Sequence, residues 1–177
     1  MLMYIAHINE KDDNYQSVEE HSYNVAKLAE AFSIQPMGNV VFNAGLFHDV
    51  GKFQALFQRR ISGEDVRVEH SGCGAQLCVK NYPNSLLGFV MAYCIAGHHS
   101  GLPNGGSKND TADMATLYGR IEREYEDYSA WEGSLSAKPF SDSDFKAFLI
   151  ADCQNDKRKI IDKLAFWIRY CFSCLTD

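Results

Sequence analysis

The sequence predicts an all-α protein, and three observations support this fold class. Apolar residues recur at helical spacing along several segments, Pro and Gly separate those segments, and alternating strand patterns are nearly absent. The chain has 177 residues, of which 46% are hydrophobic. This size suits one domain with one core, so we expect a single domain over residues 1–177.

The first expected helix begins next to Ser17, because Ser17 to Glu20 form a capping-box pattern. The residues that follow at spacings of four, three and four are His21, Val25, Leu28 and Phe32. They fall on one face of a helix, and that face is apolar except for one histidine.

The same periodicity predicts the remaining helices. Their expected ranges are residues 40–48 continuing toward 57, 70–82, 86–99, 141–151 and 155–175. Residues 86–99 are apolar on nearly every face, which predicts a central, buried helix. Residues 62–68 and 101–109 are expected to be loops, and residues 111–131 carry polar side chains with helical charge spacing that we expect on the surface.

Charge and composition exclude several classes of protein. The formal net charge of −6 counts against a protein that grips nucleic acid unaided, because such binding normally comes from Lys and Arg. An enzyme whose bound cations receive the phosphate remains compatible, and a partner would then supply much of the grip. No apolar run has membrane length, and no secretory signal is visible. The six cysteines lie mostly in apolar helical patterns, so we expect reduced core residues in a cytoplasmic protein.

The histidines are the most informative residues. There are six, and five lie where a helix would present them to the core: His21, His48, His70, His98 and His99. Asp49 follows His48 directly, and imidazole together with carboxylate favours transition metals. Each of these residues alone has an ordinary explanation, such as a hydrogen-bonded core histidine or a helix-capping group. Together, on four separate elements, they indicate a metal site.

Several motifs surround these residues in a fixed order. They are Tyr4 to His7, His48-Asp49-Val50-Gly51-Lys52, Glu69-His70-Ser71, Gly97 to Pro103 and Leu175-Thr176-Asp177. This order resembles the HD nuclease domain of the CRISPR-associated type I helicase-nuclease. The His-Asp-x-Gly-Lys core marks only the broad superfamily, whereas His-His-x-Gly-Leu-Pro with Glu-His-Ser points to the CRISPR family. Ser100 and Asn104 depart from that family's usual Gly and Asp, and neither is expected to bind metal.

The resemblance implies an HD-domain helical bundle with a central buried helix pair and a metal site at its core. It implies two divalent transition-metal ions: Mn, Fe, Ni or Co, with Mg or Zn as further options. The ligands of one ion would be His21, His48, Asp49 and Asp177, and those of the other His70, His98 and His99, with Asp49 bridging. Asp49 and Lys52 would be the catalytic residues, with Lys52 contacting the phosphate, although a solvated helix lysine explains its sequence equally well. We expect His7 to be structural.

The implied function is a metal-dependent nuclease that cuts single-stranded DNA during CRISPR interference. Its partners would be a superfamily 2-type helicase, fused or separate, and an RNA-guided surveillance complex, with no membrane involved. The helical pattern still runs at Asp177, so we expect the chain to be cut from a longer protein. Two alternatives stay open: an HD-type nucleotide or cyclic-nucleotide phosphohydrolase, and a non-enzymatic interaction module with structural histidines.

Overall fold

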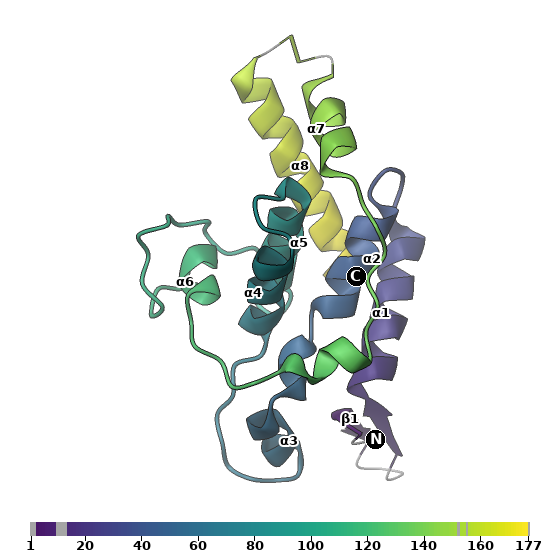
Figure 1. Cartoon of the computed structure of the whole chain (residues 1–177), viewed down its shortest axis with the longest axis vertical. Helices are drawn as coiled ribbons and strands as arrows, with labels where there is room; N and C mark the ends of the chain where they lie inside the picture. Colours follow the sequence, from purple (N-terminus) through teal and green to yellow (C-terminus); the bar gives the residue numbers. More distant parts are fainter. Residues whose placement is uncertain (1–2, 10–13, 152, 155, 177) are drawn as a thin grey trace.

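The chain folds almost entirely into helices, as a computed structural model of residues 3–9, 14–151, 153–154 and 156–176 shows (Figure 1). The elements in chain order are β1 (Ile5–Asn9), β2 (Asn14–Ser17), α1 (Val18–Phe32), α2 (Gly38–Phe47), the 3-10 helix η1 (Val50–Phe53), α3 (Ala55–Ile61), α4 (Ser71–Asn81), α5 (Leu86–Gly97), α6 (Leu117–Ile121), the 3-10 helix η2 (Ser129–Gly133), α7 (Asp142–Ile150) and α8 (Lys157–Thr176). With 59% helix and 5% strand, the predicted all-α class is confirmed.

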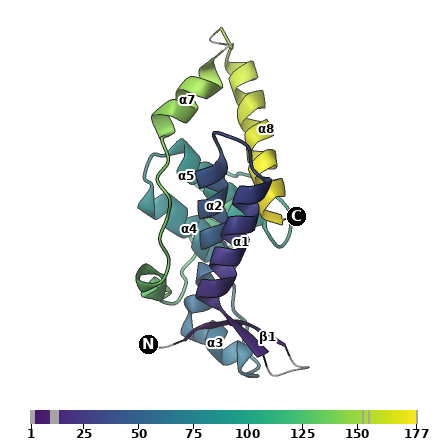
Figure 2. The same cartoon turned by 90° about the vertical axis from the view of Figure 1, so that its right-hand side faces the viewer.

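Two buried helices, α2 and α5, form the centre of the bundle. In α2 every residue except Asn39 is buried, and α5 buries most of its length, as its apolar sequence predicts. Helix α1 packs on α2, α4 packs on α5, and α8 contacts both central helices (Figures 1 and 2). The expected central helix pair is therefore present, and its two C-terminal ends carry the His-Asp and His-His motifs.

Side-chain caps fix where the helices begin. The Ser17 hydroxyl accepts a hydrogen bond from the Glu20 backbone N–H at 3.1 Å, which confirms the cap expected from the sequence. The carboxylate of Asp142, at the start of α7, accepts bonds from the backbone N–H groups of Leu86 and Leu87 at 2.8 and 2.9 Å. Because these N–H groups lie in the first turn of α5, Asp142 links the start of α7 to the central helix.

The β1–β2 hairpin is an element that the sequence analysis missed. Its strands are five and four residues long and only partly exposed, and they carry no clear alternation of polar and apolar residues. They pair antiparallel, with Ile8 opposite Tyr15 and an irregularity between Ile5 and His7. The side chain of Gln58 on α3 exchanges hydrogen bonds with the backbone of Ile5 at 2.9 and 3.0 Å. The hairpin is thereby fastened to α3, which brings His7 to the end of the bundle where α1 begins.

The expected continuation of the second helix from His48 toward residue 57 is wrong. Helix α2 stops at Phe47, Asp49 leaves the helical region with φ −114° and ψ 19°, and the chain continues as η1 and then α3. Gln54 is extended, and its side-chain amide donates to the carbonyls of Gly51 and Glu69 at 2.8 and 3.1 Å. These tertiary hydrogen bonds stabilise the bend of the chain at Gln54, and the periodicity of the local sequence does not predict them.

The segment at residues 111–131 has only short helical pieces, α6 and η2, despite its helical charge spacing. The side chain of Gln76 on α4 donates to the carbonyls of Ile121 and Arg123 at 2.8 and 3.0 Å, so these carbonyls bond across the fold instead of along a helix. The segment runs over the surface of α4, which agrees with its expected exposure.

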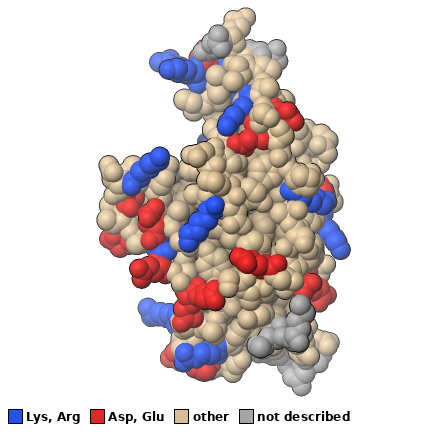
Figure 3. Space-filling view, viewed as in Figure 1, with Lys and Arg blue, Asp and Glu red and all other residues tan. Residues whose placement is uncertain are grey.

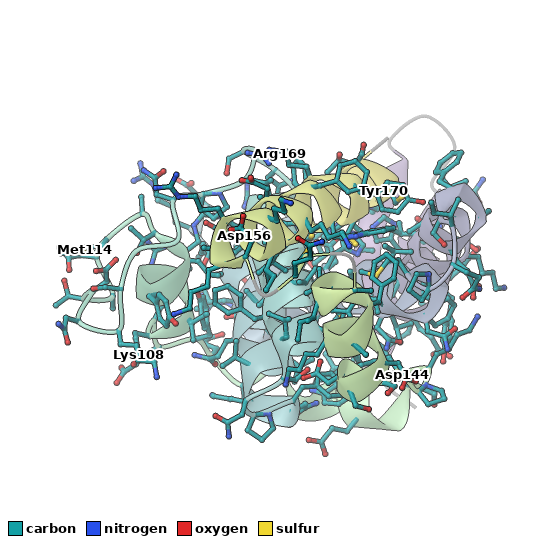
Figure 4. All side chains as sticks on the ribbon, turned by 90° about the horizontal axis from the view of Figure 1, so that it is seen from above. Lys108, Met114, Asp144, Asp156, Arg169 and Tyr170 are labelled. Carbon is teal, nitrogen blue, oxygen red and sulfur yellow. The ribbon has the colours of Figure 1, made fainter. Side chains whose placement is uncertain are left out.

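Helices α7 and α8 form one end of the molecule, away from β1 and α3 (Figures 1 and 2). Seen from above, Asp144 on α7 and Tyr170 on α8 lie on the side opposite the loop that carries Lys108 and Met114 (Figure 4). Among the described residues, no helix combines the length and apolar character needed to cross a lipid bilayer.

We expect Gly51→Ala to destabilise the fold, because a Cβ at this position would lie 2.4 Å from the His70 carbonyl oxygen and 2.6 Å from its Cα. The backbone of η1 or of His70 must then shift. The expected loss is about 1–3 kcal/mol of unfolding free energy, measured by urea denaturation. Gly133→Ala is the control, because nothing lies within 4 Å of its Cβ position, and it should cost under about 0.5 kcal/mol. Equal stability of the two variants would contradict this close packing.

Candidate metal centre

The ends of four helices converge on the carboxylate of Asp49. The histidines that surround it lie in the first turn of α1 (His21), at the C-cap of α2 (His48), at the N-cap of α4 (His70), at the C-cap of α5 (His98) and directly after it (His99). Helix termini have backbone groups without intrahelical partners, so they suit polar side chains in an otherwise apolar core. The bundle therefore gathers all five histidines singled out from the sequence at one place.

One carboxylate oxygen of Asp49 faces the first pair of histidines. Its Oδ2 lies 3.1 Å from His21 Nε2 and 3.1 Å from His48 Nε2, and these two nitrogens are 3.2 Å apart. Asp49 is 1% exposed, and His48 is also buried. Three potential ligand atoms thus form a nearly equilateral triangle in the interior.

The other oxygen, Oδ1, faces the second group. It lies 3.5 Å from both His70 Nε2 and His98 Nε2, and His70 Nε2 is 2.8 Å from His99 Nε2. The ligand atoms of Asp49, His70, His98 and His99 all lie within 4.8 Å of one another. His98 and His99 point toward this common group although they are adjacent in the sequence, as a large site requires.

The two most buried histidines are oriented by their own helices. His48 Nδ1 lies 2.7 Å from the Gly45 carbonyl oxygen, and His98 Nδ1 lies 2.7 Å from that of Ile95. A carbonyl can only accept, so each Nδ1 carries a proton and each Nε2 is turned toward Asp49. Metal-binding histidines commonly donate their second N–H in this way. The C-terminal turns of α2 and α5 therefore set both ligand tautomers.

The residues present fit a metal ion. Metal–ligand bonds of about 2.0–2.1 Å separate neighbouring ligand atoms by about 2.8–3.4 Å across octahedral and tetrahedral geometries, a range that contains the three distances around Oδ2. Asp49 Oδ1 and His98 Nε2 are buried and have no hydrogen-bond partner among the described residues. Buried polar atoms left in this way are costly unless a ligand satisfies them, and a cation bound between these two atoms would satisfy both.

Lys52 and His7 extend the cluster on the side of the hairpin. Lys52 is 4% exposed, so the interpretation as a solvated helix lysine is wrong; its Nζ lies 2.8 Å from Asp49 Oδ2 and 3.2 Å from His7 Nε2. His7 has ligand atoms within 4.8 Å of those of His21 and Asp49. The sequence analysis gave His7 no role at the site, because nothing in the sequence showed that the hairpin returns it to the start of α1. The role of Lys52 at the phosphate stays a prediction.

Burial and neighbouring charges shift several pKa values here. Burial works to raise the pKa of Asp49, but the charge of His48 and hydrogen bonds from the histidines outweigh it and hold this pKa well below its usual value. Burial lowers the pKa of His70 to about 4, and burial first and His98 second lower the pKa of His99. Metal ligands must be an ionised carboxylate and neutral imidazoles, and these directions favour both forms at neutral pH.

Six of the seven metal ligands implied by the sequence resemblance lie together in this cluster. These six are His21, His48, Asp49, His70, His98 and His99. The seventh, Asp177, lies outside the described residues. Glu69, which the sequence analysis noted only within a motif, positions His70: its carboxylate accepts from Ser71 Oγ and the Gly72 N–H and so caps α4.

The sequence of this helical bundle matches a known protein family. The family model for the HD domain matches residues 18–127, which is more than half of the chain. The chain belongs to the HD domain family. HD domains are typically metal-dependent phosphohydrolases, and the matched range contains every ligand of the described cluster except the additional His7. No curated protein matches the chain.

We expect Mn²⁺ to stabilise the wild-type fold, because a ligand that binds only the folded state raises its stability. At a hundredfold excess over Kd the gain is about 2.7 kcal/mol, measured by thermal or urea unfolding with and without metal. In Asp49→Asn, which loses the charge shared by both histidine groups, the gain should disappear. Asp65→Asn, an exposed position outside the cluster, is the control and should keep it. A metal response that survives in Asp49→Asn would contradict the assignment.

The pH dependence of the metal-free protein gives a second check on His70. Its pKa is about 4 in the folded chain and about 6.5 when unfolded, so the unfolded state binds the extra proton between these values. The free energy of unfolding of the metal-free protein is therefore highest above pH 6.5, as far as His70 is concerned. It decreases as the pH falls toward 4, because unfolding then lets His70 take up a proton. His70→Asn should flatten this part of the stability profile in urea titrations with chelator, since Asn suits an N-cap and does not titrate. Parallel profiles for both proteins would speak against a buried, neutral His70.

Proposed function

We propose that this HD domain is a metal-dependent nuclease that cuts single-stranded DNA in CRISPR interference, using two divalent cations. The observation that carries the proposal is Asp49, whose two oxygens face separate histidine groups, so that one buried carboxylate can bridge two ions. Sites with two cations about 3.5–4 Å apart are suited to phosphodiester hydrolysis. The sequence motifs around His70 and His98 supply the argument for the CRISPR family.

The chemistry divides between the cations and the chain. Bound cations would lower the pKa of a water molecule to near neutrality and would offset the negative charge of the phosphate. Asp49 fixes the spacing of the two ligand groups, and the α2 and α5 carbonyls hold His48 and His98 in the ligating tautomer. Lys52 Nζ binds Asp49 Oδ2 and is the ammonium group nearest to the incoming phosphate in this proposal.

A polymeric substrate agrees with the exposure of the site. His7 and His99 are exposed and His70 is half-buried, so the second histidine group opens to the surface and a chain can pass across it. The net charge is −6, and on the face in Figure 3 basic side chains lie among acidic ones without forming a continuous basic patch. We therefore assign most of the DNA grip to partners in the cytoplasm: a superfamily 2-type helicase, fused or separate, and an RNA-guided surveillance complex.

The test is cleavage of circular single-stranded DNA by the purified chain with Mn²⁺, Fe²⁺, Ni²⁺ or Co²⁺. Wild type should convert circles to linear and shorter products, because endonuclease action needs no ends. Asp49→Asn should lose at least about a hundredfold in rate, and chelator should abolish cleavage. Asp65→Asn should cut like wild type.

A wild type that binds metal but leaves DNA intact with every ion would contradict the nuclease proposal. A panel of nucleotides and cyclic nucleotides is therefore tested on the same sample. Hydrolysis in that panel alone would indicate the HD-type nucleotide phosphohydrolase, and no hydrolysis of either substrate class would indicate the interaction module.

A further inference from the structure

A small pocket adjoins the exposed side of the candidate metal centre. Its volume is about 310 Å³, and its walls include His70 and His99 of the centre together with Phe57, Arg60 and Ile61 of α3. Pockets for small ligands typically start at about 300 Å³, so there is room for a group the size of one nucleotide. The pocket therefore offers a binding surface beside the metal centre, formed jointly by two of its histidines and by residues of α3.

The pocket is cationic in an acidic chain. Its walls also contain Lys52, and no acidic side chain lines it among the residues that the structure describes. Lys52 is committed to Asp49 at 2.8 Å, whereas Arg60 is exposed and forms no ion pair with any carboxylate in the part of the chain described. The neighbouring Arg59 is paired with Glu64 at 2.8 Å and does not line the pocket. Of these two adjacent arginines, Arg60 alone presents an uncommitted guanidinium beside the metal centre.

The rest of the α3 wall is apolar. Phe57 is 7% exposed; its ring packs against the His70 ring, with centroids 5.5 Å apart, and Lys52 Nζ lies 5.5 Å from the Phe57 centroid. Phe57 thus forms a fixed floor that supports two polar groups of the site. Ile61 adds a half-buried apolar surface next to it. An apolar floor with one guanidinium suits a sugar or base followed by a phosphate.

We propose that this pocket binds the nucleotide next to the scissile linkage, and that Arg60 binds the phosphate of that neighbouring nucleotide. The inference rests on the nuclease function proposed above and adds a residue to it that is not a metal ligand. Arg60 would act in substrate binding, because it lies on α3 and not among the groups around Asp49. A diester with a single phosphate has nothing for Arg60 to bind, so recognition by this pocket would favour a nucleic-acid strand.

The test compares Arg60→Ala with Arg59→Ala, which removes the same charge from the same helix. Both proteins are loaded with Mn²⁺ and assayed on single-stranded oligonucleotides and on bis(p-nitrophenyl) phosphate. For Arg60→Ala we expect KM for DNA to rise about two- to fivefold with little change in kcat, and the slope of log KM against log salt to fall by about 0.7. Hydrolysis of bis(p-nitrophenyl) phosphate should be unchanged. Arg60→Lys should recover part of the DNA affinity, and Arg59→Ala should resemble wild type.

Each outcome separates this inference from the function on which it rests. If wild type cuts DNA and Arg60→Ala leaves KM and its salt slope unchanged, or matches Arg59→Ala, the pocket assignment is wrong and the nuclease stands. An equal loss on both substrates would mean that Arg60 supports the metal centre, which also overturns the assignment. If wild type hydrolyses bis(p-nitrophenyl) phosphate but no DNA, the nuclease proposal fails and the inference fails with it.

Discussion

A single buried carboxylate organises this protein. Asp49 is almost completely shielded from water, and such a charge is stable only if cations or hydrogen-bond donors surround it. Four helix termini, the turn into η1 and the ammonium group of Lys52 supply that environment. The close approach of Gly51 to His70 and the break in helix geometry at Asp49 both follow from bringing these termini together. The same arrangement leaves Asp49 Oδ1 and His98 Nε2 without a hydrogen-bond partner among the described residues, and a bound metal ion would satisfy both.

The central helices do more than fill the core. Because α2 and α5 are buried over most of their length, their C-terminal carbonyls lie in a region of low polarity and hold His48 and His98 in one tautomer. Function is thereby built from an ordinary property of helices, namely the unpaired carbonyls of the last turn. The hairpin and α3 then add the exposed side of the site, where His7 and Arg60 lie at the surface.

Helical periodicity, a local signal, predicted the helical class and one buried central helix. The central helix pair and the convergence of the five histidines on Asp49 were implied by the family resemblance, which rests on the order of the motifs. The sequence did not predict the β1–β2 hairpin, since its short strands have no clear alternation to recognise, or the bends around Gln54 and Gln76, since side-chain bonds across the fold cause them. His7 was missed for the same reason: its place at the site depends on Gln58 fastening β1 to α3. For Lys52 the sequence explained a solvated helix lysine as well as a catalytic one, and its burial against Asp49 rules out the first. The described part of the chain also leaves the expected ligand Asp177 without a tested role.

The proposed nuclease function depends on whether Asp49 and the histidines around it would hold two divalent cations. Anomalous X-ray diffraction from Mn²⁺-loaded crystals tests it directly, because each ion gives a peak at a defined position. We expect one anomalous peak between Asp49 Oδ2 and the pair His21 and His48, and a second peak on the Oδ1 side toward His98. A single peak would contradict the bridging role while leaving a mononuclear site, and the absence of any peak near Asp49 would contradict the metal centre itself.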